Sequence, residues 1–211
     1  MRSHRWSVVL IGVAATFASC SSRATPRSEE SRSAATVTRS SFLIHRGSIG
    51  VGAKISVAGD ETLRDIELTI DFFHGTERVR REHDTLPFCH AIQPCLWGMS
   101  FVMNDAGERL VDRVAITVQS DGGPYDDDAA IRSPTVARTD ASLSLTTPDA
   151  RGVLYLIAIE DGDPVFGTSV SQTRAEGSEI HFDGAQFPLE HEVVAVFYEG
   201  HVPGAGSPGA D

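Results

Sequence analysis

The stretch IELTIDF, residues 66–72, alternates apolar and polar side chains from end to end. Because successive side chains of a β-strand point to opposite faces, every second residue from Ile66 to Phe72 would lie on one face. Strict alternation with a period of two is typical of a strand that is buried on one side only. The stretch therefore predicts an antiparallel strand packed on an apolar core.

Similar alternating segments lie on both sides of this stretch. Turn-forming sequences such as Gly59-Asp60 and His74-Gly75 separate them, as expected where Gly and Asp close antiparallel turns. A continuous apolar run at 153–159 fits a central strand, and Asp-Gly at 161–162 predicts a hairpin after it. Further strands are expected at 49–57, 96–103, 114–118, 141–145, 180–182 and 192–198.

Short strands separated by turns are typical of a β-sandwich. The segments 68–79 and 155–166 share the order of strand, polar turn and strand, and they loosely resemble immunoglobulin-like domains of bacterial lipoproteins. We therefore expect an all-β fold, an antiparallel immunoglobulin-like β-sandwich arranged as two small domains. The first domain is expected at 41–120 and the second at 136–200, joined by an acidic linker at 121–135.

The first twenty residues have the order of a secretory signal peptide. Arg2 and Arg5 form a basic start, an apolar run follows, and small residues precede Cys20. The sequence FASC at 17–20 is similar to the lipobox of bacterial lipoproteins. That resemblance implies removal of residues 1–19 and a diacylglyceryl group on Cys20.

The lipobox resemblance implies a location outside the bacterial cytoplasm, with the chain anchored to a membrane of the cell envelope. Plain secretion or a periplasmic location, with cleavage after a small residue such as Ala24, stays open, as does a buried N-terminal helix. Residues 20–40 are rich in Ser, Arg, Ala and Thr and are expected to be a disordered tether. The Gly- and Pro-rich segment 201–211 is expected to be a disordered tail.

Net charge narrows the choice of partners. The chain has 18 Lys and Arg against 29 Asp and Glu, a formal net charge of −11. Loss of Arg2 and Arg5 with the signal segment would make this −13. Such a chain repels the phosphates of nucleic acids and of anionic lipids, so nucleic acid is not expected as a partner and membrane attachment should depend on the lipid.

Cys89 and Cys95 remain as an even pair once Cys20 is assigned to the anchor. In an oxidising compartment an isolated pair predicts a disulfide. By the chain-entropy estimate, closing so short a loop stabilises the fold by roughly 2–2.5 kcal/mol. The bond would hold a local loop rather than the whole fold.

The same loop has a second interpretation as a soft-metal site. Cysteine, imidazole and thioether groups together suit copper, and cysteine with histidine suits zinc. His83 and His90 are the candidate ligands, with Met99 and Met103 nearby in sequence. A disulfide would use both thiolates, the cysteine spacing is wider than in zinc knuckles, and both methionines fit a core. No metal or cofactor is therefore expected.

Other chemical signals are weaker. The run Asp126-Asp127-Asp128 could hold Ca²⁺, but EF-hand spacing is absent and a solvated acidic segment explains it as well. A short helix is expected around 126–132. No Gly-x-Ser-x-Gly or His-Glu-x-x-His motif is present. His181 and His191 could serve as a general base, although scattered histidines on β surfaces are mostly structural or solvated.

The sequence thus predicts a membrane-tethered extracytoplasmic binding or scaffold module without catalytic activity. Loops such as 86–96, or exposed strand edges, would recognise a protein or an envelope component. The alternative is an extracytoplasmic protein that binds copper or zinc through His83, His90 and the cysteine loop. An enzyme of another type ranks third.

Overall fold

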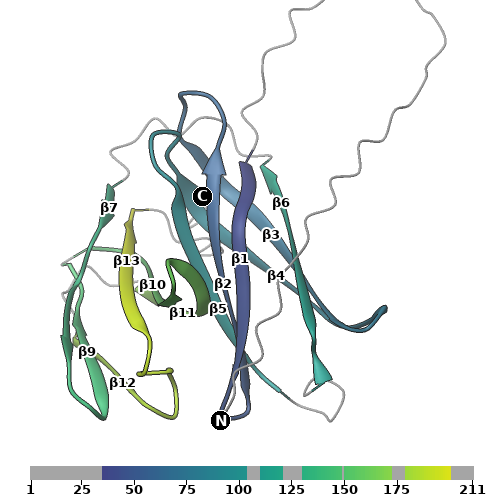
Figure 1. Ribbon diagram of the computed structural model, residues 1–211. Helices are drawn as coiled ribbons and strands as arrows, with labels where there is room; N and C mark the ends of the chain where they lie inside the picture. The colour runs from purple at the N-terminus through teal and green to yellow at the C-terminus, as the bar shows by residue number, and fades with distance from the viewer. Residues whose placement is uncertain (1–34, 104–109, 121–129, 149, 173–178, 201–211) are drawn as a thin grey trace, which may run out of the picture.

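The computed structural model describes residues 35–103, 110–120, 130–148, 150–172 and 179–200 (Figure 1). These residues form thirteen β-strands, all paired antiparallel, and no α-helix. The all-β fold class is confirmed. None of the described chain forms an apolar helix of membrane-spanning length. The expected signal segment, Cys20, the acidic run at 126–128 and the C-terminal tail lie outside the described residues.

The first half of the molecule contains two sheets that enclose a common core. One sheet has the order β1-β2-β5, formed by Ala35–His45, Ser48–Val57 and Cys95–Val102. The other has the order β4-β3-β6, formed by Glu77–Cys89, Leu63–His74 and Arg113–Ser120. The alternation predicted at 66–72 is confirmed, since the apolar residues of that stretch are all 0% exposed.

The second half contains two further sheets. One has the order β11-β10-β13-β7, formed by Asp163–Gln172, Gly152–Glu160, Glu192–Glu199 and Ala130–Arg132. The other has the order β12-β9-β8, formed by Glu179–Asp183, Ser142–Thr146 and Thr135–Arg138. The chain passes from β7 in one sheet to β8 in the other through Ser133 and Pro134. A proline cannot donate to a strand ladder, which suits this change of sheet.

The two halves repeat one strand order. The sheet β1-β2-β5 corresponds to β8-β9-β12, and β4-β3-β6 corresponds to β11-β10-β13, with β7 added. The hairpins β3–β4 and β10–β11 occupy equivalent places in this order. The segments 68–79 and 155–166, which share the order of strand, polar turn and strand, therefore lie at equivalent places in the topology.

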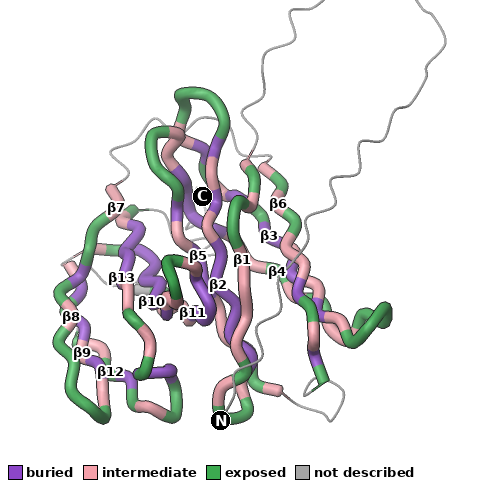
Figure 2. Tube along the Cα trace, in the orientation of Figure 1, coloured by how far each residue is buried: buried purple, intermediate pink, exposed green. Residues whose placement is uncertain are grey.

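Strand β10 is buried on both faces, as Figure 2 shows. Val153, Tyr155 and Ile157 belong to the core shared with the first half. Leu154 and Leu156 belong to a second core within the second half. Burial on both faces explains why residues 153–159 form a continuous apolar run instead of alternating.

Glycines allow β11 to lie directly on the outer face of the β1-β2-β5 sheet. A Cβ atom at Gly167 would come within 2.2 Å of the Gly98 Cα, and a Cβ at Gly50 would overlap the Phe166 ring. At the same place, Val51 and Ile49 point to the opposite face and into the first core. The two halves therefore pack through close backbone contact.

Two expected boundaries are wrong. Strand β1 begins at Ala35, so residues 35–40 belong to the sheet and not to the tether expected at 20–40. The sequence does not indicate this part of β1, because it is mostly polar. In the structure, the hydroxyls of Thr36 and Thr38 donate to main-chain carbonyls of β2. Likewise β7 and the start of β8 fall within the linker expected at 121–135, and residues 130–132 are strand and not helix.

Candidate functional site

The disulfide between Cys89 and Cys95 is present, as predicted. Their Cα atoms are 5.7 Å apart, and both residues are buried. Cys89 ends β4 and Cys95 begins β5, so the bond joins edge strands of the two facing sheets. Between them the loop presents Ile92, which is 89% exposed.

The structure does not assemble the cysteine loop and its histidines into a metal site. Both sulfur atoms are bonded to each other. The Nδ1 atom of His83 lies 3.1 Å from the Thr69 hydroxyl, and that of His90 lies 2.6 Å from the Thr62 hydroxyl. In the described ranges, no group of three His, Cys, Asp or Glu residues is placed to hold a metal ion.

The two methionines near this loop behave as expected. Met99 and Met103 are partly buried and pack against the larger core. They are thus part of the packing around that core.

His181 and His191 have different polar neighbours, and the Nε2 atom of His191 lies 4.0 Å from a Glu190 oxygen. His181 lies opposite Ser144 in the β9–β12 ladder, with its Nδ1 atom 2.8 Å from the Ser144 hydroxyl. Its Nε2 atom is 3.7 Å from a Glu179 oxygen. This Ser-His-Glu order resembles that of hydrolytic triads. However, the His181 and Glu179 side chains are more than 60% exposed, so water screens their interaction.

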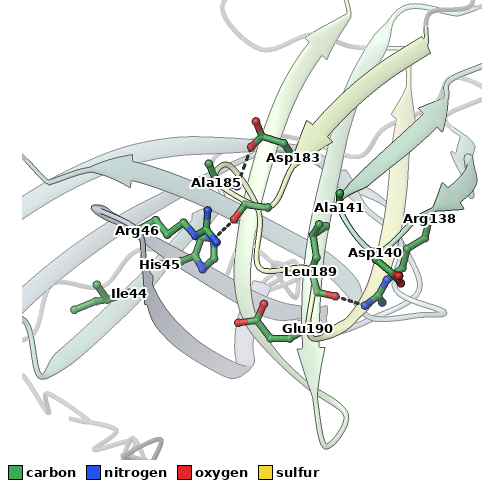
Figure 3. A pocket seen from close by; sticks show the side chains of 11 residues that line it. Ile44, His45, Arg46, Arg138, Asp140, Ala141, Asp183, Ala185, Leu189 and Glu190 are labelled. Carbon is green, nitrogen blue, oxygen red and sulfur yellow. Dashed lines mark hydrogen bonds between the residues drawn. The ribbon is translucent and has the colours of Figure 1, made fainter. Parts of the chain in front are cut away.

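A cleft lies between the two halves and was not predicted (Figure 3). Its volume is about 960 Å³. One wall is the β1–β2 turn, with His45 and Arg46. The others are residues 138–141, around the β8–β9 turn, and the segment 183–190 after β12. Figure 3 also shows Ile44 at the rim, with its side chain turned away from the other residues.

Side chains hold the walls of this cleft by bonding to main-chain carbonyls. The Nε2 atom of His45 lies 2.8 Å from the Gly184 carbonyl oxygen. The guanidinium of Arg138 donates to the carbonyls of Leu189 and His191. An oxygen of Asp183 accepts main-chain N–H groups of the following turn at 2.8 and 3.0 Å. These bonds fix the segment 183–191 against both of its neighbours.

The cleft presents charges of both signs. The guanidinium of Arg46 makes no hydrogen bond or ion pair with the described residues, and it lies at one side. Asp140 and Glu190 are exposed and lie elsewhere around the opening. The cleft can therefore contact a cation and an anion of one polar partner at different points.

A polar network of buried and partly buried residues lies where the two halves meet. An oxygen of Asp84 accepts a hydrogen bond from Trp97 Nε1 at 2.6 Å, and burial raises the pKa of that carboxyl. The Tyr198 hydroxyl donates to the Leu96 carbonyl at 2.8 Å, and burial raises its pKa as well. The Tyr155 hydroxyl donates to the Thr85 carbonyl at 3.4 Å. These bonds tie β10 and β13 to β4 and β5.

Comparison with known proteins adds no family to this description. The chain matches no model of a known protein family, and no curated protein is significantly similar to its sequence.

Proposed function

We propose that this chain is a noncatalytic binding or scaffold module, tethered outside a bacterial cell by a lipid on Cys20. The observation that carries the proposal is the cleft between the β1–β2 turn and the segment after β12. Three separate segments build it, and hydrogen bonds to carbonyls hold their relative positions. Recognition sites commonly lie on loops that a rigid scaffold positions in this way.

The chemistry of the cleft favours a polar partner with both charges. Arg46 would pair with a carboxylate or phosphate, while Asp140 and Glu190 would pair with an amine or guanidinium. The half-exposed peptide backbone around Gly184 would offer further hydrogen bonds. A segment of a partner protein or a zwitterionic envelope component has this chemistry.

The tether is proposed from the sequence. The basic start, the apolar run and FASC at 17–20 support export and lipid attachment at Cys20. The disulfide between Cys89 and Cys95 suits an oxidising compartment. Residues 21–34 would separate the anchor from β1.

The test is crosslinking in intact cells, followed by pull-down and mass spectrometry, with wild type compared to Cys20→Ala. We expect the wild type in the membrane fraction with a stoichiometric partner, and loss of both in the variant. A soluble wild type would contradict the tether. A reproducible hydrolytic activity lost in His181→Ala or His191→Ala would contradict the noncatalytic role.

A further inference from the structure

The two ends of strand β1 lie at opposite ends of the first half of the molecule. Ala35 begins the strand and pairs with Val57 of β2. Two residues before Val57, Ile55 pairs with Cys95 of the disulfide. His45 ends the strand at the β1–β2 turn, which forms one wall of the cleft. Strand β1 has 11 residues, so its ends lie roughly 33 Å apart at the usual rise per residue.

The loop at 90–94 lies at the same end as Ala35, remote from the cleft. The disulfide between Cys89 and Cys95 joins the two residues that flank this loop. The loop contains no Asp, Glu, Lys or Arg, and its Ile92 side chain is 89% exposed. The end of the fold at which the described chain begins thus presents a short loop with an apolar tip.

The length of chain between the proposed anchor and β1 favours one orientation at a membrane. Residues 21–34 would span at most about 50 Å if they were fully extended. With the loop at 90–94 toward the bilayer, these residues connect Cys20 to Ala35 directly. With the cleft toward the bilayer, they would also have to pass along roughly 33 Å of β1. Stretching a chain toward its full length costs conformational entropy, so the first orientation is favoured.

Charge limits how this end can contact lipid. Asp60 and Glu61, in the turn between β2 and β3, are exposed at the same end, and the whole chain has a formal net charge of −11. Anionic lipids would repel these carboxylates. Contact by Ile92 alone is weak, but an anchored chain holds its loop at a high effective concentration beside the bilayer. The apolar tip can therefore add to the orientation that the anchor sets.

We propose that the end with Ile92 at its tip contacts the membrane that holds the anchor, and that the cleft binds a polar peptide segment of a protein lying beyond that membrane. This orientation depends on the lipid at Cys20 that is proposed above. It adds the source of the ligand that the cleft takes.

Two sources share the chemistry that the cleft would recognise. Arg46, with Asp140 and Glu190 around the opening, would fit the phosphate and amine of a zwitterionic lipid headgroup or the acidic and basic groups of a peptide. The headgroups of the anchoring membrane lie on the far side of the fold, roughly 33 Å or more from the cleft. A peptide segment is therefore the ligand that this position selects.

The test uses the full chain, purified from bacterial membranes and reconstituted into vesicles of equal parts phosphatidylethanolamine and phosphatidylglycerol with a lipid that carries a nitroxide on its headgroup. A fluorescent amino acid replaces Gln93 in the loop or Ala185 in the cleft, both of which are exposed. We expect the nitroxide to quench the fluorophore at 93 several-fold more strongly than the one at 185. Vesicle-bound protein with equal quenching, or with stronger quenching at 185, would overturn the orientation. Protein that does not stay on the vesicles would overturn the anchor on which the orientation depends.

Two aspartate variants test the contact made by Ile92. Ile92→Asp should lower the quenching at position 93, because a charge then replaces the apolar tip. Val102→Asp is the matched control, since Val102 is 66% exposed at the opposite end of β5, and it should leave this quenching unchanged. Equal effects of the two variants would refute contact through Ile92.

A photoreactive amino acid at position 185 tests the source of the ligand. In the same vesicles, without other proteins, we expect no phospholipid adduct from this position. In intact cells we expect an adduct with a polypeptide, which Arg46→Glu should abolish. A phospholipid adduct from position 185 in vesicle-bound protein would show that the cleft takes a headgroup, and it would overturn the peptide assignment.

Discussion

At the residue scale, Asp84 is a carboxylate enclosed where the two halves of the molecule meet. It follows other charged residues of β4, and nothing in its sequence neighbourhood distinguishes it from them. Only the structure shows that the Asp84 side chain points inward. There the Trp97 indole of the opposite sheet donates a hydrogen bond to it at 2.6 Å. A period-two pattern cannot reveal a charged residue on the inner face.

The raised pKa of Asp84 sets the direction of a pH effect. The folded chain holds this proton more tightly than the unfolded chain, because burial penalises the charged form. The stabilisation from the protonated carboxyl is complete below the unfolded pKa and is lost as pH rises through the folded pKa. Asp84→Asn keeps an oxygen for the Trp97 bond and removes the charge. We expect its unfolding free energy to exceed that of wild type at pH 7, with the difference shrinking toward pH 4, in urea titrations.

Asp71 provides a control of opposite sign. A hydrogen bond from Arg81 lowers the pKa of Asp71, so its contribution is present at neutral pH and is lost as pH falls through the folded pKa. Asp71→Asn should therefore be less stable than wild type at pH 7. If Asp84→Asn also lost stability at pH 7, the assigned cost of burying the Asp84 charge would be wrong.

At the scale of elements, the contact between β11 and the β1-β2-β5 sheet depends on glycine. Gly167→Ala would place its Cβ 2.2 Å from the Gly98 Cα, and backbone on both sides must then move. We expect a loss of about 3 kcal/mol in the unfolding free energy, measured by urea denaturation. Gly184→Ala is the matched control, because its Cβ would meet nothing closer than 3.4 Å. Equal losses in both variants would show that the close approach is not the cause.

How much of the fold the sequence predicts depends on how each element is buried. The strands at 66–72 and 153–159 were predictable, because burial on one face produces alternation and burial on both produces an apolar run. Strand β1 begins in a mostly polar stretch, in which only Ala35 and Val37 pack against the core and threonine hydroxyls donate to the neighbouring strand. Strands β7 and β8 are too short to show a period.

At the scale of the whole molecule, one core joins both halves. Tyr155 and Tyr198 of the second half belong to the same buried cluster as Trp97 of the first. Leu143 lies in the other cluster, which shares β10 with it. The two halves should therefore unfold together.

Leu143→Ala tests this coupling. The residue is 0% exposed, so its truncation should cost about 3 kcal/mol. We expect the urea midpoint reported by Trp97 fluorescence to fall together with the midpoint from circular dichroism. A Trp97 midpoint that stays at the wild-type value while the dichroism transition splits would show independent halves.

The cleft could not be predicted from the sequence, for a physical reason. His45, Arg138 and Glu190 come from three segments that are far apart in the sequence. Each segment has the sequence pattern of an ordinary turn or strand end. Only the packing of β11 on the first half brings these segments together. The disulfide, in contrast, was predictable because both of its cysteines lie in one short loop.

The most direct test of the binding proposal is photocrosslinking in intact cells from a residue inside the cleft. A photoreactive amino acid would replace Ala185, and the control would carry it at Glu77, at the turn of the β3–β4 hairpin. The proposal predicts one discrete crosslinked product from position 185, lost when Arg46→Glu is added, and none from position 77. No product from 185, or the same product from both positions, would contradict recognition through the cleft.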